Sequence, residues 1–480
     1  MSILHSIFTL PGLIAGLVGI AVGILSFWLF GVIRRRRLLR VIAAVQNRSI
    51  RNPHYGEPSG DVAEGARATS FDQPRPSGAI FLESITIRNF KNITKLKVDL
   101  MRPSTLTGEW TCIAGINGVG KTSILQAICL VLLGGELVNE LGRGRLGRLL
   151  RRTTDGVVDA EIEAFVLRDK IRTRLYVPLK HAGPGEAAVD IETLRSAPDY
   201  PEMAKIWTDL RRQVVVGYGA NRNVSDFKDS RVLNYSRTVQ RQMTMFDPLT
   251  QLASVDVILE GGLKAQPVIR TLSSLILLVL QSEALSPTSS TSGGKLQFSM
   301  HDAALDVIDL PDGFRSTIAW LADLCAAWHE RAGADANVDP AEITGIVLLD
   351  EIGLHLHPSL EKALVPQLRK ALPRVQFIVS THSPMVLSSF DREELVILDA
   401  ASPGGTKELD RQVFGMTMDE VYSWLMNTSP GSPVMEEMLE KEDPDVAMFL
   451  YQSKDVSQEL ARKLIDARRE DIKELKRKRD

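Results

Sequence analysis

The stretch Gly115-Ile-Asn-Gly-Val-Gly-Lys-Thr122 decides the fold of this chain. It follows an apolar run, Thr111–Ala114, and precedes a helical run, Ser123–Leu133. A glycine-rich loop between a strand and a helix lets successive backbone N–H groups converge on a phosphate, and the positive end of the helix dipole adds to the attraction. The sequence therefore predicts a nucleotide site, and the residues expected to bind the nucleotide are Gly115, Asn117, Gly118, Gly120, Lys121, Thr122 and Ser123.

A second apolar run, Ile346-Val-Leu-Leu-Asp-Glu351, is typical of a buried parallel strand and ends in two carboxylates. Lys121 is expected to reach the β- and γ-phosphates of ATP, and Thr122 and Asp350 are expected to hold Mg²⁺. Glu351 is placed to orient or deprotonate the attacking water. The alternative is a strand that ends in two solvated acids without a catalytic role.

Two further segments suit the same site. The strand-like run Val375–Thr381 delivers His382 to a strand end, where ligands bind in open α/β sheets, and we expect this histidine to contact the γ-phosphate. The stretch Leu310-Pro-Asp-Gly-Phe-Arg-Ser316 precedes a helical run, Thr317–His329, so Gly313 and the helix start could present another anion site. Taken alone, His382 would be a structural loop histidine.

The bulk composition is that of an ordinary globular protein. The chain has 480 residues, 24% of them charged and 44% hydrophobic, which is long enough for two or three domains. The net charge of −2 gives no whole-chain argument for nucleic acid. Cys112, Cys129 and Cys325 each lie in an apolar run, so we expect buried thiols in a reducing compartment.

The N-terminal region predicts a membrane anchor. Residues Ile7 to Ile33 carry no charge, and a helix of that length spans about 40 Å at ~1.5 Å per residue, more than the ~30 Å hydrocarbon layer. A cleaved signal peptide would have basic residues before the apolar core, whereas here Arg34–Arg37 follow it. The positive-inside rule then predicts a single-pass inner-membrane protein whose catalytic body is cytoplasmic. Residues 34–79 are expected to be a basic stop-transfer segment and a flexible linker.

The order of the motifs resembles that of the ABC-type ATPase superfamily: Gly115–Thr122, Leu310–Ser316, Leu349–Glu351 and Ser380–His382. The opening stretch Leu82–Lys91 resembles the branch that contains the SMC, RecF and OLD-family ATPases. Within that branch, Asp350-Glu-Ile-Gly-Leu-His-Leu-His-Pro358 is similar to the OLD-like and the Septu- and retron-associated ATPases, as is Gly217–Arg222. The similarity extends over roughly Phe81 to Asp399.

This resemblance implies an α/β fold, that of a P-loop NTPase of ABC-ATPase type, with a mixed sheet flanked by helices and a β-rich N-terminal lobe. It implies a head at residues 80–400 with an insertion at about 134–300, and we expect a helical C-terminal region at 401–480. Two heads of such proteins sandwich two nucleotides, so Asp312 and Gly313 would act on ATP held by a second copy. Pro311 departs from the usual serine after the signature leucine, which predicts slow activation in trans.

The implied function is an ATP-gated switch, dimeric or of higher order, that controls an effector in defence against phage or foreign nucleic acid. No Toprim-like acidic motif follows Asp399, so no intrinsic nuclease is expected and a partner nuclease would do any cutting. The alternatives are a RecF-like repair ATPase and a nucleotide-dependent scaffold that does not hydrolyse. Basic residues between Arg143 and Arg152 are a candidate DNA or RNA contact, or else a solvated face. The pair His355 and His357 lacks a third metal ligand nearby.

Overall fold

The computed structural model describes residues 77–101, 108–225, 235–259, 266–280, 286–288, 296–300, 303–333, 339–399, 405–407, 409, 413 and 421. The predicted membrane span at 7–33, the segment 34–76 and most of the C-terminal region 401–480 lie outside these residues. Among the helices within the described ranges, none has both the length and the apolar composition needed to cross a bilayer.

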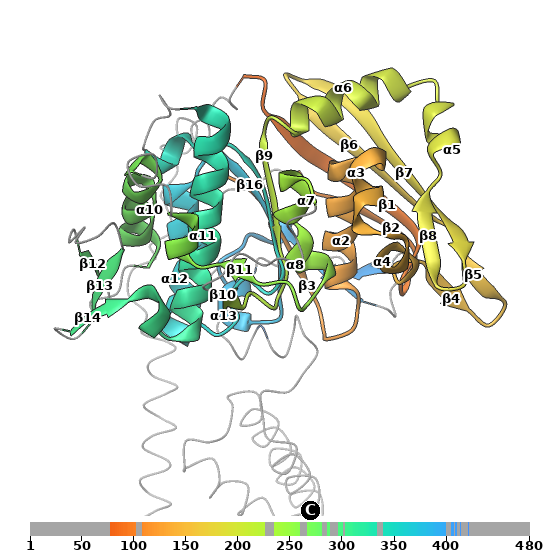
Figure 1. Ribbon diagram of the computed structural model, residues 1–480. Helices are drawn as coiled ribbons and strands as arrows, with labels where there is room; N and C mark the ends of the chain where they lie inside the picture. Colours follow the sequence, from red (N-terminus) through yellow and green to blue (C-terminus); the bar gives the residue numbers. More distant parts are fainter. Residues whose placement is uncertain are drawn as a thin grey trace, which may run out of the picture. The chain divides into compact units, whose positions relative to one another are not determined.

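The central element is a six-stranded mixed sheet (Figure 1). All neighbouring strands are parallel except β17 and β18, which pair antiparallel at one edge of the sheet. The parallel strands are buried along their length, as expected for strands covered on both faces. In spatial order the strands are β18 (Thr406–Lys407), β17 (Leu395–Leu398), β3 (Glu109–Ala114), β16 (Val375–Thr381), β15 (Gly345–Leu349) and β9 (Val214–Tyr218).

Alternate side chains of these strands enter two separate hydrophobic cores. In β15, Val347 and Leu349 pack with the helices on one face, whereas Ile346 and Leu348 pack with those on the other. The first core contains α10 (Gln266–Val279), α11 (Asp312–Ala332) and α12 (Pro358–Ala371), which lie together on one side of the sheet (Figure 1). Nearly every side chain of α2 (Lys121–Leu133) is buried, because this helix lies between the central sheet and a second, antiparallel lobe.

The second lobe is a five-stranded antiparallel sheet in the order β2-β1-β6-β7-β8. Its first two strands pair antiparallel, with Thr86 opposite Lys97. The other three strands come from the stretch 134–300, so part of that stretch completes the lobe. The strands are β1 (Ile80–Phe90), β2 (Ile93–Asp99), β6 (Ala160–Arg168), β7 (Ile171–Gly183) and β8 (Glu186–Val189).

Short elements connect these layers. Around the lobe they are α3 (Gly135–Val138), η1 (Asn139–Leu141), α4 (Arg143–Gly147), β4 (Arg151–Thr153), β5 (Gly156–Val158), α5 (Ile191–Arg195) and α6 (Tyr200–Leu210). Between β9 and α11 they are β10 (Val224–Ser225), α7 (Arg237–Gln240), α8 (Met243–Phe246), β11 (Leu252–Ala253), α9 (Val255–Ile258), β12 (Ser286–Thr288), β13 (Gln297–Met300), β14 (Ala303–Asp306) and η3 (Val307–Asp309). The last ones are η4 (Pro340–Glu342), α13 (Pro384–Leu387) and η5 (Arg392–Glu394).

One helix begins earlier than the sequence indicates. The sequence places the start of α11 at Thr317, but the helix begins at Asp312, directly after the extended residue Pro311. Proline cannot donate a backbone hydrogen bond, and an acidic residue in the first turn is favoured by the helix dipole. The stretch Leu310–Ser316 is therefore largely a helix start and not a loop. The thiols of Cys112, Cys129 and Cys325 are free and buried, as predicted.

Candidate nucleotide-binding site

The loop between β3 and α2 has the backbone that a phosphate cradle requires. Gly115, Gly118 and Gly120 have φ angles of 149°, 81° and 116°, values that side-chain-bearing residues rarely adopt. At Gly115 the approach is also close, because an added Cβ would lie 2.9 Å from the carbonyl oxygen of Leu398. The predicted strand, loop and helix are therefore present, with α2 beginning at Lys121 itself.

Lys121 is held at the centre of this loop. Its side chain is 6% exposed, and its Nζ donates a hydrogen bond to the carbonyl oxygen of Gly115 at 2.9 Å. The same Nζ lies 3.4 Å from Oε1 of Glu351. A buried ammonium group needs such partners, since an isolated charge is costly to bury. The loop lysine and the distant carboxylate are thus brought together as the sequence predicts.

Asp350 joins the phosphate loop to the end of β16. The Thr122 hydroxyl donates to Oδ2 of Asp350 at 2.7 Å, and the Ser380 hydroxyl donates to Oδ1. Hydroxyl and carboxylate oxygens are the hard ligands that Mg²⁺ prefers, usually together with water and phosphate oxygens. Thr122 and Asp350, the two predicted metal ligands, therefore lie side by side and fit this ion.

Glu351 contacts both of the other catalytic candidates, Lys121 and His382. Its Oε1 faces Lys121, and its Oε2 lies 2.8 Å from Nδ1 of His382. The backbone N–H of His382 donates to the same oxygen at 3.1 Å. The Glu351 side chain is 16% exposed, whereas that of His382 is 50% exposed. One carboxylate thus connects the phosphate loop to a histidine that faces solvent.

Sequence reasoning missed the residue that supports this geometry, Arg222. Its Nη2 donates to the carbonyl oxygen of Glu351 at 2.9 Å, and its Nη1 donates to the carbonyl oxygens of Asp350 and of Gly219. Burial lowers the pKa of Arg222 to about 10, so the guanidinium stays charged at neutral pH. The only signal in the sequence was the stretch Gly217–Arg222, noted for its resemblance to relatives.

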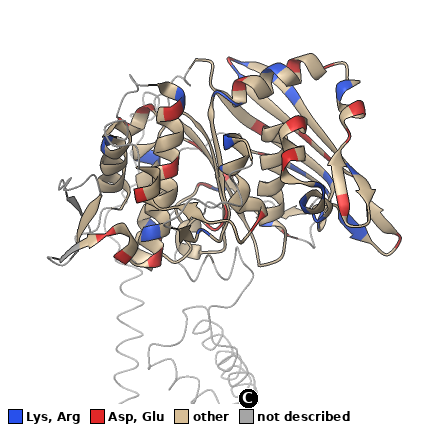
Figure 2. Cartoon of the chain, in the orientation of Figure 1, with Lys and Arg blue, Asp and Glu red and all other residues tan. Residues whose placement is uncertain are grey.

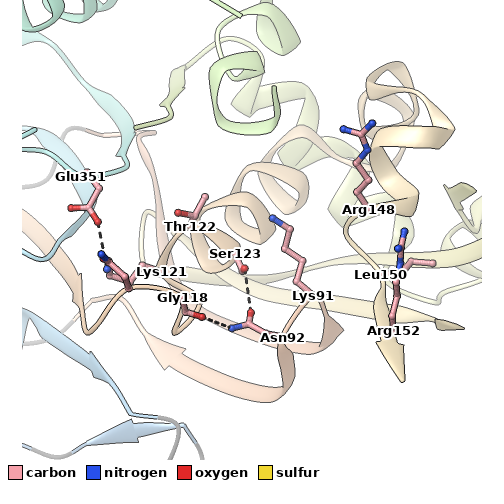
Figure 3. Close-up of a pocket in the computed structure, with 12 residues that line it drawn as sticks. Lys91, Asn92, Gly118, Lys121, Thr122, Ser123, Arg148, Leu150, Arg152 and Glu351 are labelled. Carbon is pink, nitrogen blue, oxygen red and sulfur yellow. Dashed lines mark hydrogen bonds and ion pairs between the residues drawn. The ribbon is translucent and has the colours of Figure 1, made fainter. Parts of the chain in front are cut away.

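A cavity of about 790 Å³ opens above the loop (Figure 3). Most of the predicted binding residues line it, while Gly115 does not; those that do are Asn117, Gly118, Gly120, Lys121, Thr122 and Ser123. Glu351 also lines the cavity. The sequence did not point to the remaining lining residues, which are Lys91, Asn92, Arg148, Leu150 and Arg152.

The turn between β1 and β2 places Lys91 and Asn92 beside the loop. Asn92 Nδ2 donates to the carbonyl oxygen of Gly118 at 3.1 Å, and the Ser123 hydroxyl lies 3.4 Å from Asn92 Oδ1 (Figure 3). Lys91 Nζ donates to Oε1 of Gln126 at 2.7 Å. Burial lowers the pKa of Lys91, while the charge of Asp350 opposes this shift.

Asp312 and Gly313 lie away from this cavity. They belong to the start of α11, which packs so closely that a Cβ on Gly313 would be 2.3 Å from the carbonyl oxygen of His355. Asp312, Arg222 and His355 line a second cavity of about 60 Å³. His357 caps α12 through Ser359. Within the described ranges, no three His, Cys, Asp or Glu side chains are grouped as metal ligands would be.

The arginines between Arg143 and Arg152 do not form one surface, although Figure 2 shows basic residues gathered around α4. Arg145 is paired with Asp247 at 2.9 Å and also donates to the Tyr235 hydroxyl. Arg151 donates to the carbonyl oxygen of Asn92 at 2.9 Å. Arg148 and Arg152 line the large cavity, so the segment is divided between structural contacts and the site.

A loop lysine, a hydroxyl–carboxylate pair and a second carboxylate beside a histidine are the arrangement typical of P-loop nucleotide-binding domains. The family described as "AAA domain" matches residues 84–212, and the family described as "AAA domain, putative AbiEii toxin, Type IV TA system" matches residues 292–388. Two separate segments of this chain are therefore similar to AAA domains.

The chain is similar to Septu protein PtuA of Bacillus mycoides (strain KBAB4), at 28% identity over 322 residues, which is 66% of this chain and 40% of that protein. It is also similar to the Retron Ec83 probable ATPase of Escherichia coli, at 39% identity over 98 residues, which is 20% of this chain and 18% of that protein. The resemblance to Septu and retron ATPases that the sequence indicates is confirmed. A solved SMC head bound to the C-terminal winged-helix domain of ScpA aligns with 68% of this chain and 97% of its own, at 17% identity and a TM-score of 0.43.

The contacts of Arg222 predict that it positions the backbone of Asp350 and Glu351. Arg222→Lys keeps the charge but cannot reach both carbonyl oxygens with one planar group, so we expect ATP turnover to fall by about ten- to a hundredfold. The dissociation constant for ATP should change little. Both are measured by phosphate release and by calorimetric titration of the nucleotide.

Arg369→Lys is the matched control, because Arg369 is another buried arginine with two bonds to one partner, Glu394, at 2.8 and 2.6 Å. This control should lower the melting temperature without a comparable loss of turnover. An equal loss of turnover in both variants would show that Arg222 only stabilises the fold.

Proposed function

We propose that this protein binds ATP with Mg²⁺ and hydrolyses it, using Lys121, Asp350, Glu351 and His382. The observation that carries the proposal is the Glu351 carboxylate, which is shared between Lys121 and His382, next to the Asp350–Thr122 pair. These groups come from the ends of two neighbouring strands, β15 and β16, and from the phosphate loop that follows β3. A purely structural cluster would not require a glycine-rich anion cradle beside it.

Each residue has a distinct task in this reaction. The Lys121 ammonium and the loop N–H groups stabilise negative charge on the phosphates. Glu351 accepts a proton from water, or orients it, and His382 fixes one oxygen of that carboxylate. Thr122 and Asp350 would hold Mg²⁺, which would neutralise part of the phosphate charge.

The proposal extends to a nucleotide-dependent homodimer or higher oligomer that works as a switch. Asp312 and Gly313 lie outside the cavity of their own chain, which suits a role on ATP held by a second copy. Ile116 at the tip of the phosphate loop is 58% exposed, an apolar side chain that a second head would cover. Nucleotide binding would close this contact and hydrolysis would release it.

Glu351→Gln should abolish turnover while ATP binding is retained, because the amide keeps the shape of the side chain but cannot accept a proton. We expect phosphate release to fall by at least about a hundredfold. The variant should accumulate as an oligomer when ATP is present, as measured by light scattering. Lys121→Ala is the control, and it should lose ATP binding and the ATP-dependent oligomer together. Turnover at the wild-type level in Glu351→Gln would refute the assigned base.

The biological role that we propose is defence against phage or foreign nucleic acid, with ATP binding controlling an effector such as a nuclease. Its support is the similarity to Septu and retron ATPases, of which the matched segments span 40% and 18%. The Glu351→Gln variant also tests this role. Cells that carry the gene with its genomic neighbours should lose resistance to phage when the variant replaces the wild-type chain, and unchanged plating efficiency would contradict the role. Nucleic-acid binding through Arg143–Arg152 stays a separate prediction.

Residues 7–33 are proposed to anchor the protein in the inner membrane, with the ATPase domain in the cytoplasm. Replacing Ile20 and Val22 by arginine should release the protein into the soluble fraction, since a charge at the bilayer centre costs about 3 kcal/mol. Leucine at the same two positions is the control and should leave it in the membrane pellet after a high-salt wash. An arginine variant that stays in the pellet would contradict the anchor.

A further inference from the structure

The large cavity has two chemically different ends. Glu351 and Lys121 form one end, and Arg148 and Arg152 lie at the opposite end, with Ser123 and neighbouring residues between them (Figure 3). On a phosphate loop the lysine serves the β- and γ-phosphates. The terminal phosphates therefore belong at the Glu351 end, and the nucleoside must extend toward the arginines.

The arginine end is fixed to the phosphate loop by a chain of contacts. Asn92 donates to the loop at Gly118, and its own carbonyl oxygen accepts from Arg151. The backbone N–H of Lys91 donates to the carbonyl oxygen of Leu149 at 2.8 Å. Phe90 and Leu150 form an antiparallel bridge. The segment carrying both arginines is therefore held at a defined place beside the nucleotide.

A further contact fixes the beginning of this segment. Gly147 lies so close to the turn between β7 and β8 that a Cβ on it would be 2.0 Å from the carbonyl oxygen of Gly185. Only glycine fits there, and this close contact fixes the position of the backbone just before Arg148. The backbone that carries the two arginines is therefore fixed by contacts with the β1–β2 turn and the β7–β8 turn.

The two guanidinium groups are available to a ligand. Arg148 and Arg152 are exposed, and no carboxylate in the described part of the chain lies within ion-pair distance of either, in contrast to Arg145 with its partner Asp247. No aromatic residue is among the described residues that line this cavity. A planar guanidinium can itself stack on a base and can donate to its ring nitrogens and carbonyl oxygens.

We propose that Arg148 and Arg152 bind the nucleobase of the nucleotide, stacking on the purine and donating to its acceptor atoms. The inference rests on the proposed nucleotide site. It favours the base over the phosphates, because Lys121 and the loop N–H groups already serve the phosphates. It favours a mononucleotide over nucleic acid, because Arg145 and Arg151 are engaged within the chain and cannot extend a basic surface. Since both groups only donate, ATP and GTP should bind with similar affinity.

The test compares two ligands that differ by the nucleoside. The affinities of the full-length protein for ATP and for inorganic tripolyphosphate, both with Mg²⁺, are measured by titration calorimetry in the wild type and in Arg148→Ala/Arg152→Ala. We expect the dissociation constant for ATP to rise by about tenfold or more and that for tripolyphosphate to change by less than about twofold. Arg143→Ala is the matched control, since this exposed arginine of α4 does not line the cavity, and it should change neither constant.

Four results would overturn the inference. An equal loss for both ligands would assign the arginines to the phosphates. No loss for either ligand would remove them from the site, and a simultaneous loss of DNA or RNA binding would assign them to nucleic acid. An ATP affinity far above the GTP affinity would show base recognition by other groups. Failure of the nucleotide site itself is distinct, because Lys121→Ala would then leave ATP binding unchanged.

Discussion

One backbone turn at the end of β15 determines the whole site. Successive side chains of a strand point to opposite faces, yet Asp350 and Glu351 both serve the phosphate loop. Glu351 makes this possible by adopting a left-handed backbone conformation, with φ of 50°, which costs roughly 1–2 kcal/mol in a residue other than glycine. Two hydrogen bonds offset that cost. Ser380 accepts the Glu351 backbone N–H at 2.9 Å, and Arg222 donates to its carbonyl oxygen.

The order of strands in the sheet explains why Ser380 and Arg222 lie next to Glu351. β15 lies between β9 and β16, so the loop after β9 supplies Arg222 and the end of β16 supplies Ser380 and then His382. The Asp350 backbone N–H also donates to the carbonyl oxygen of Tyr218, the last residue of β9, at 2.9 Å. The parallel strands are buried on both faces, and this packing fixes the positions of the strand ends that carry the site. The sheet thus positions the carboxylates and their partners, while the phosphate loop provides the backbone N–H groups that would bind an anion.

The sequence predicted what depends on contiguous patterns and missed what depends on packing between distant segments. The phosphate loop, the two carboxylates and His382 each follow an apolar strand, so their positions at the strand ends could be predicted locally. Arg222 could not be assigned a role, because its partners lie 128 and 129 positions away along the chain. The same reason hid Lys91, Asn92, Arg148 and Arg152, which reach the cavity only because the antiparallel lobe packs over α2. The sequence of Arg143–Arg152 suggests one continuous basic surface, but Asp247, about a hundred positions away, pairs with Arg145.

The central claim is a division of labour in which Asp350 serves the metal and Glu351 serves the water. It is tested most directly by measuring how the affinity for ATP depends on Mg²⁺ in Asp350→Asn, by titration calorimetry with and without the metal. The account predicts that Mg²⁺ strengthens ATP binding in the wild type by about tenfold or more, and that this gain disappears in the variant while metal-free binding persists. A variant that keeps the full gain from Mg²⁺ would contradict the account.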